Sequence, residues 1–84
     1  MTISPEVLGR YAADAAAEVP GVHTKQRRGA RVAGTEVEVH LVVDYGADIP
    51  LVAADVQRHV VDYLQRMADL TPTAVNVVVD DVQR

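Results

Sequence analysis

The chain has 84 residues and a net charge of −4, with no cysteine, phenylalanine or tryptophan. This length fits a single domain over residues 1–84, and the lack of cysteine excludes disulfide bonds and cysteine-based zinc sites. A chain this acidic and this poor in aromatic rings is not expected to bind nucleic acid. Because it shows neither a signal peptide nor a membrane-spanning run, we expect a cytoplasmic protein.

Residues 4–19 have the pattern of an amphipathic helix. Ser4 is a typical N-cap residue and Pro5 suits the first helical position. The apolar stripe is rich in alanine, which favours a close approach to a sheet. Its members are Val7, Leu8, Tyr11, Ala12, Ala15 and Val19. Pro20 and Gly21 then end the helix.

The next segment, residues 23–33, is polar and basic. Half of the eight basic residues lie in it, namely Lys25, Arg27, Arg28 and Arg31. Its weak alternation of apolar residues predicts an edge strand or a mobile arm. A short turn at Ala33-Gly34 would place Arg31 opposite Glu36 in the following strand.

Residues 36–45 alternate between apolar and polar side chains and predict a strand. One face carries Val37, Val39, Leu41, Val43 and Tyr45. The other carries Glu36, Glu38, His40 and Asp44, with Val42 as the apolar exception. Because this is the cleanest alternation in the chain, we expect this strand to be the central one.

Residues 49–70 predict a long second helix, and residues 74–82 predict a last strand. The apolar stripe of the helix consists of Val52, Val56, Val60, Tyr63, Met67 and Leu70. The order α-β-β-α-β predicts an α+β fold, with two helices on one face of a three-stranded mixed sheet. A right-handed crossover makes the last strand parallel to the central one.

The corner YGADIP, between the central strand and the long helix, is a weak candidate for a phosphate site. Such a site needs several glycines and free backbone N–H groups, and here Gly46 stands alone. Asp48 would repel an anion and Pro50 removes a donor. We therefore interpret the corner as the structural start of the helix and expect no cofactor.

Candidate chemistry elsewhere is sparse. Asp55, His59 and Asp62 have helical spacing that could present them on one face, but without a fourth ligand we favour solvated acid–histidine pairs over a metal site. Asp80 and Asp81 are neighbours in a strand, so we expect them on opposite faces, unable to act on one bond. We therefore do not expect an enzyme.

Three stretches together carry a resemblance to a known family: ISPEVLGRYAADAAAEVPGV, VVDYGADIPLVAADVQRHVVDYLQRM and VNVVVDDV. They resemble the alkaline shock protein family, the Gls-type general stress proteins of the bacterial envelope stress response. The resemblance runs from about Ile3 to Val82. The chain departs from the family at RMADL, where members usually have Thr-Gly before the leucine.

This resemblance implies a non-enzymatic protein of the cytoplasm. Family members self-associate, some are held at the inner membrane face by a membrane-anchoring protein, and their role is in cell-envelope homeostasis. The family has no active-site motif that could be transferred. A KH-like RNA-binding module is the alternative suggested by the order of elements, but the GXXG loop that such a module needs is missing.

Two surfaces are candidates for contacts. Lys25, Arg27, Arg28 and Arg31 form either a docking patch for an acidic protein tail or anionic lipid, or only a solvated edge. Val42 and Val78 interrupt the polar face of the sheet, the face opposite the helices. We expect both valines to be exposed there and to mediate self-association.

Overall fold

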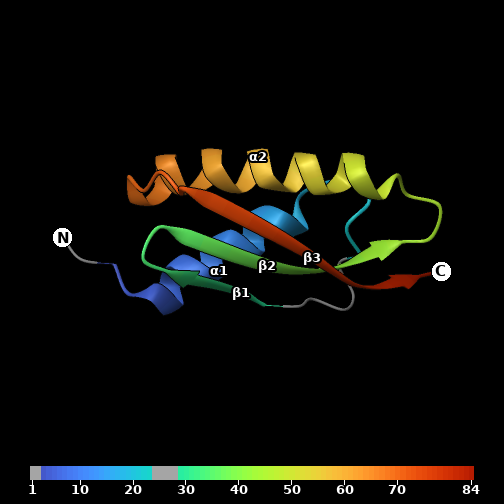
Figure 1. Ribbon diagram of the computed structural model, residues 1–84, viewed down its shortest axis with the longest axis horizontal. Helices are drawn as coiled ribbons and strands as arrows, with labels where there is room; N and C mark the ends of the chain where they lie inside the picture. Colours follow the sequence, from blue (N-terminus) through green and yellow to red (C-terminus); the bar gives the residue numbers. More distant parts are fainter. Residues whose placement is uncertain (1–2, 24–28) are drawn as a thin grey trace.

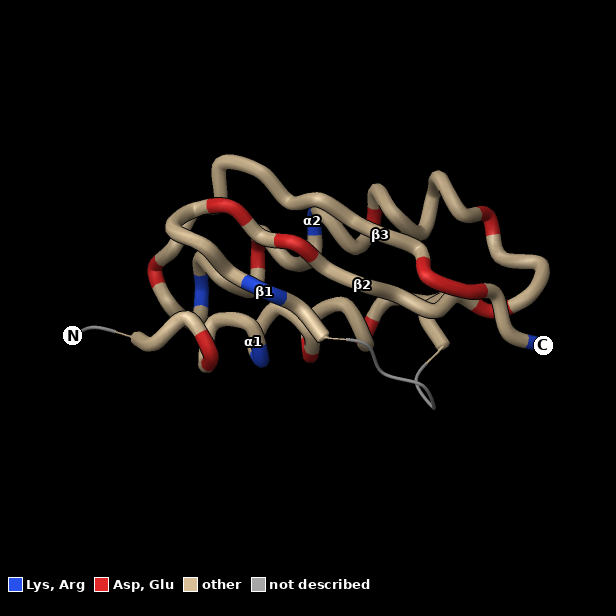
Figure 2. Tube along the Cα trace, turned by 60° about the horizontal axis from the view of Figure 1, so that its bottom comes forward, with Lys and Arg blue, Asp and Glu red and all other residues tan. Residues whose placement is uncertain are grey.

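The computed structural model describes residues 3–23 and 29–84. Its elements are α1 (Pro5–Ala17), β1 (Ala30–Ala33), β2 (Glu36–Asp44), α2 (Ile49–Ala68) and β3 (Ala74–Gln83). Figure 1 shows the sheet with α2 along its upper side and α1 behind it. Figure 2 shows the face of the sheet that carries no helix, with α2 behind the strands and α1 below β1. The predicted α+β class and the predicted order of elements are confirmed.

The sheet has the strand order β1-β2-β3, which confirms β2 as the central strand. β1 pairs antiparallel with β2, and β3 pairs parallel with β2 after the crossover through α2. The pairing of β1 places Arg31 opposite Glu38 and Ala33 opposite Glu36. The expected pairing of Arg31 with Glu36 is therefore wrong, because the turn lies one residue later, at Gly34 and Thr35.

Both helices begin where the sequence predicts. The Ser4 hydroxyl accepts a hydrogen bond from the Val7 N–H, and Asp48 Oδ1 accepts one from the Leu51 N–H, both over 3.3 Å. Each bond satisfies one of the unpaired N–H groups at a helix start. Gly46 has a φ of +87°, which glycine adopts without strain. The geometry of the YGADIP corner is thus that of a turn followed by a helix cap.

Helix α1 lies against β1 through its smallest residues. Gly9, Ala12, Ala15 and Ala16 are its buried positions. A Cβ atom added to Gly9 would lie 2.7 Å from the carbonyl oxygen of Ala30. Contact at that distance is repulsive, so the separation between α1 and β1 depends on glycine at this position.

Helix α2 covers the sheet with a straight row of four residues spaced by four: Val52, Val56, Val60 and Leu64. The expected stripe is correct for Val52, Val56 and Val60, and its members Tyr63 and Leu70 are partly buried against the core, but it is wrong at Met67. Met67 is 50 % exposed, whereas Leu64, which that stripe omits, is fully buried. Residues four apart are neighbours on a helix surface, so one such row follows the line of contact with the sheet.

Helix α2 ends at Ala68, and Asp69 takes the left-handed conformation with a φ of +52°. The Asp69 N–H donates to the Gln65 carbonyl, and the Leu70 N–H donates to the Leu64 carbonyl, both over 3.2 Å. This is the arrangement in which helices usually have glycine. The chain therefore keeps the usual helix end although it lacks the glycine.

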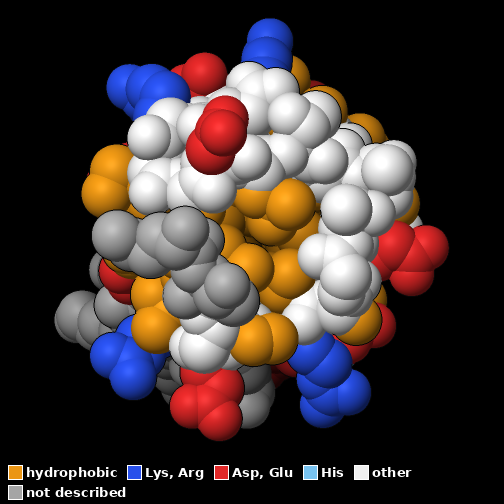
Figure 3. Space-filling model, turned by 90° about the vertical axis from the view of Figure 1, so that its left-hand side faces the viewer, with side chains coloured by type: hydrophobic (Ala, Val, Ile, Leu, Met, Phe, Trp, Pro, Cys, Tyr) orange, Lys and Arg blue, Asp and Glu red, His pale blue; other side chains and the backbone are white. Residues whose placement is uncertain are grey.

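The hydrophobic core lies between the helices and the sheet and comes to the surface at one end of the molecule. Figure 3 looks at the end where α1 begins and α2 finishes, and apolar side chains gather at its centre. All the buried hydrophobic residues except Val42 belong to a single cluster. That exception matters for the face of the sheet without helices.

Candidate interaction surface

The candidate interaction surface is the face of the sheet turned away from the helices, called the open face below. Strand alternation places on it Arg31 of β1, then Glu36, Glu38, His40, Val42 and Asp44 of β2, and Asn76, Val78 and Asp80 of β3. Figure 2 shows acidic positions along β2 and β3 and a basic position on β1. The described part of this face is therefore mostly acidic.

His40 lies in the middle of the open face and joins two strands. Its Nδ1 atom is 3.2 Å from the carboxylate of Asp80 on β3, and its Nε2 atom is 3.1 Å from Glu38 Oε2. These hydrogen bonds, that of Glu38 first, raise the pKa of His40 above its ordinary value. An imidazole donates from both nitrogens only when it is protonated, so this position favours a positive charge.

The prediction that Val42 is exposed on the open face is wrong. Only 1 % of Val42 is exposed, although it lies outside the core cluster. Residues 21–23 run beside this end of β2, where the His23 N–H donates to the Val42 carbonyl over 2.7 Å. On the same face, Val42 lies between His40 and Asp44, and Asp44 is held by His23 at 2.8 Å. Val42 is therefore not available to a partner.

Val78 has the exposure that the sequence predicts. It lies opposite His40 on the edge strand β3 and is 37 % exposed. Of the two valines expected to mediate self-association, Val78 alone presents its side chain to the surface. Its role in association stays a prediction.

The basic segment lies mostly outside the described residues, because Lys25, Arg27 and Arg28 fall between residues 23 and 29. Arg31 is described, and its side chain is on the exposed side of β1. It stands opposite Glu38 in the pairing of β1 with β2. Whether these four residues form a docking patch stays a prediction.

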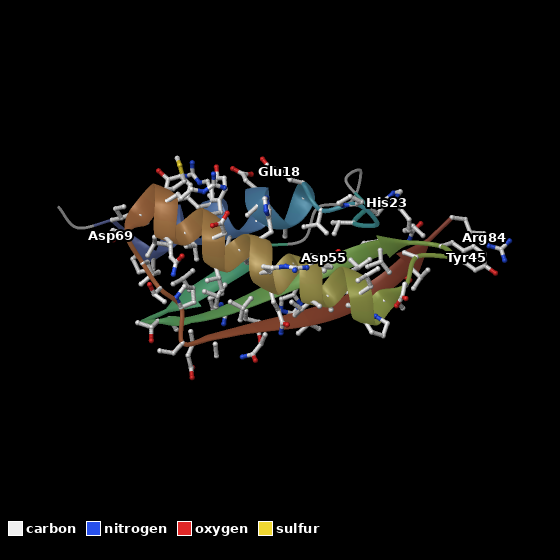
Figure 4. All side chains as sticks on the ribbon, turned by 90° about the horizontal axis from the view of Figure 1, so that it is seen from above. Glu18, His23, Tyr45, Asp55, Asp69 and Arg84 are labelled. Carbon is white, nitrogen blue, oxygen red and sulfur yellow. The ribbon has the colours of Figure 1, made fainter. Side chains whose placement is uncertain are left out.

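The three residues expected as solvated acid–histidine pairs on α2 each have a different partner. His59 Nε2 lies 2.8 Å from Glu18 Oε2 of α1's C-terminal end, Asp55 pairs with Arg58, and Asp62 pairs with Arg66. Figure 4 shows Glu18 on the neighbouring helix, beside α2. In residues 3–23 and 29–84, no group of three or more candidate ligands is arranged to hold a metal ion.

A bulge in β3 changes the placement of the two adjacent aspartates. The pairing with β2 skips Asp80, so Asp81 lies opposite Val42. Because Val42 and His40 both belong to the open face, this register places Asp81 on the same face as Asp80, so the expectation of opposite faces is wrong. The two carboxylates nonetheless have separate partners, since Asp80 contacts His40 whereas Asp81 Oδ1 accepts from the Val82 N–H over 2.8 Å.

Tyr45 does not join the core face of β2 as expected. It is 66 % exposed, and the Arg84 guanidinium lies over its ring at 4.7 Å from the centroid. Figure 4 shows both side chains together at the carboxyl end of the sheet. Tyr45 follows the last residue of β2, beyond the region that the helices cover. Its spacing of two from Val43 therefore does not make it a core residue.

Neither described helix is both long enough and apolar enough to cross a membrane. Searches of curated proteins and of solved structures found no significant match. The model of the alkaline shock protein 23 family, described as having a cell envelope-related function, matches residues 29–84, well over half of the chain. The match includes β1, β2, α2 and β3, is consistent with the resemblance noted in the sequence, and is not to a family of known enzymes. The chain therefore belongs to the alkaline shock protein 23 family.

Proposed function

We propose that this protein is a non-enzymatic scaffold or adaptor of the bacterial envelope stress response. It associates with itself and acts through protein contacts in the cytoplasm, near the inner face of the membrane. The observation that carries the proposal is the family match over residues 29–84, with its cell envelope-related function. The uncovered face of a three-stranded sheet supports a role in contacts, because such a face offers a flat surface to a partner.

The part of the open face that suits self-association is β3 with Val78. An exposed valine alone needs no explanation. Here, however, it stands on the long edge strand of the sheet, where backbone groups on one side lack a neighbouring strand. The proposed contact between copies therefore moves from the Val42–Val78 pair to Val78 and its strand.

A membrane-anchoring protein is the second proposed partner, and the basic segment is its proposed docking site. Replacing Arg27, Arg28 and Arg31 with Glu should abolish binding to the partner or to anionic liposomes. The same reversal of three exposed helix charges, in Arg10, Arg58 and Arg66, is the matched control and should leave binding intact. Equal binding by both triple variants at moderate salt would refute the docking site.

The proposed function is tested by cross-linking in native cells and capture of the tagged full chain. The expected result is recovery of further copies of the chain together with a membrane-embedded protein, and loss of envelope-stress tolerance in a deletion strain. The proposal would be overturned if the captured chain brought down RNA and neither protein, and if treatment with ribonuclease removed the captured material. Normal stress tolerance in the deletion strain would refute a role of this protein in the envelope stress response.

A further inference from the structure

The outer edge of β3 can be mapped group by group. On β2 the even-numbered residues turn their backbone groups away from β3, since the His40 N–H donates to the Gly29 carbonyl and the Asp44 N–H to the Gly21 carbonyl. The odd-numbered residues of β2 therefore bond to β3. In the observed parallel pairing, Val37 lies opposite Val75, so the odd-numbered residues of β3 point away from β2.

Side chains of the protein already occupy both ends of this outer edge. At one end Gln57 Nε2 donates to the Val75 carbonyl over 2.9 Å, which agrees with its outward direction. At the other end the Val82 N–H donates to Asp81 Oδ1. Between them lie Val77 and Val79, whose outward N–H groups donate to no group, and whose outward C=O groups accept from no group, in the described part of the chain. One outward group is thus taken at each end of the edge, whereas in its middle both groups of Val77 and both groups of Val79 are open.

We propose that a second copy of this chain pairs with that middle, antiparallel, with the twofold axis at Val78. The proposal rests on the self-association proposed above and names its interface. Val77 of each copy would stand opposite Val79 of the other. The N–H and C=O groups of these two residues in both chains would form four hydrogen bonds, and the two sheets would become one sheet of six strands.

The neighbouring registers fit less well. An axis at Val77 would place Val79 opposite Val75, whose carbonyl already accepts from Gln57. An axis at Val79 would place Val77 opposite Asp81, inside the bulge, where pairing is irregular. The axis at Val78 is the register in which both groups of Val77 and both groups of Val79 are paired with open groups of the second copy.

Side chains on both faces are compatible with this register. On the open face the two Val78 side chains would meet at the axis, and Asn76, which has amide donors, would face the Asp80 carboxylate of the second copy. Val82 lies opposite Val43 in the pairing of β3 with β2, which places it on the helix face, and it is 41 % exposed. In the second copy it would reach the groove between α2 and β3, which is lined by Ala54, Gln57, Val61, Pro72 and Val75 among others.

The test uses opposite charges at the axis. Val78→Asp and Val78→Lys each place two like charges face to face, so each variant alone should raise the dimer dissociation constant at least about tenfold. Mixed in equal amounts at low salt, the two variants should form a heterodimer with affinity restored toward that of the wild type. Sedimentation equilibrium of the full chain measures all three samples.

Ala33→Lys is the control, because Ala33 lies on the exposed side of β1, at the opposite edge of the sheet. It should leave association unchanged. A dimer that survives both Val78 variants would overturn the β3 pairing and leave self-association standing. Two variants that dissociate but do not recombine would overturn the position of the axis. A wild-type chain that stays monomeric at all concentrations would refute self-association itself.

Discussion

Val42 and Val78 lie on the same face of the sheet, on adjacent strands, yet one is buried and the other is exposed. Val42 belongs to the central strand, with β3 on one side and residues 21–23 on the other. Val78 belongs to an edge strand with a neighbour on one side only. The comparison shows that exposure on a face without helices depends on how many neighbours flank the strand and on how their side chains pair.

The largest expected effect comes from placing the same charge at both positions. Val42→Asp should lower the free energy of unfolding by about 3 kcal/mol or more, because an unpaired carboxylate would replace a fully buried methyl pair. Val78→Asp should change the stability of the monomer by no more than about 0.5 kcal/mol, since its side chain is already partly in water. Urea denaturation of both variants, at concentrations where the chain is monomeric, measures the difference.

Equal stability of the two variants would break the comparison. It would mean that the side chains around Val42 open readily and admit water. A strong loss with Val78→Asp would mean instead that Val78 is covered in the monomer, and its use as a probe of association would fail.

The next effect concerns the covered face. Gly9→Ala should destabilise the protein, because its new Cβ would lie 2.7 Å from the Ala30 carbonyl oxygen and force α1 away from β1. Strain of this kind costs about 1–3 kcal/mol, and the better helix propensity of alanine offsets up to about 1 kcal/mol of it. We therefore expect a net loss of about 1 kcal/mol in thermal or chemical unfolding.

Gly29→Ala is the matched control, since nothing lies within 4 Å of a Cβ atom at that position. It should be close to neutral. A stabilised Gly9→Ala variant would show that α1 moves freely on β1, and that the covered face is packed less tightly than the open-face position Val42.

The sequence predicts the frame of this molecule well, because that frame depends on local signals. Helix starts follow from Ser4 and Asp48, and the covered face of β2 follows from its strict alternation. The parallel pairing of β3 follows from the helical crossover that connects it to β2. Each of these inferences needs only a residue and its neighbours in the chain.

The errors have a different origin, since each needs contacts between distant residues. Val42 is buried on a face without helices, and the segment that runs beside it, residues 21–23, lies about twenty positions earlier in the chain. The bulge at Asp80 shows no signal in the run of valines before it. The sequence does not identify the open backbone groups of β3 either. One of the groups that is occupied, the Val75 carbonyl, is bonded by Gln57 of helix α2, which is distant in sequence. The candidate surface is therefore mostly a product of tertiary structure.

A smaller effect is expected at the end of α2, the helix that covers the opposite face from Val78. Asp69→Gly should stabilise the protein by about 0.5–1 kcal/mol, because glycine adopts the left-handed conformation without strain and removes a negative charge from the helix C-terminus. Asp69→Asn should give part of this gain, whereas Asp69→Ala should give none. A gain with Asp69→Ala equal to that with glycine would assign the effect to charge alone.

The smallest effect concerns pH and returns to the open face, where His40 lies opposite Val78. The hydrogen bonds from Glu38 and Asp80 raise the pKa of His40 in the folded state, so folding favours the protonated imidazole. The stabilisation should be fully present below the ordinary pKa of 6.5 and should be lost as the pH rises through the raised value. The positive charge of Arg31, which lies diagonal to His40 on β1, disfavours the protonated imidazole, but Arg31 itself stands opposite Glu38.

His40→Gln removes the titrating group and keeps a polar side chain. The difference in unfolding free energy between wild type and His40→Gln should therefore favour the wild type more at pH 6 than at about pH 8.5, with both values above the range where carboxylates titrate. A difference that is constant with pH, or that grows as the pH rises, would mean that His40 is not held protonated between the two strands. In that case the carboxylates of Glu38 and Asp80 would leave the middle of the open face negatively charged around Val78.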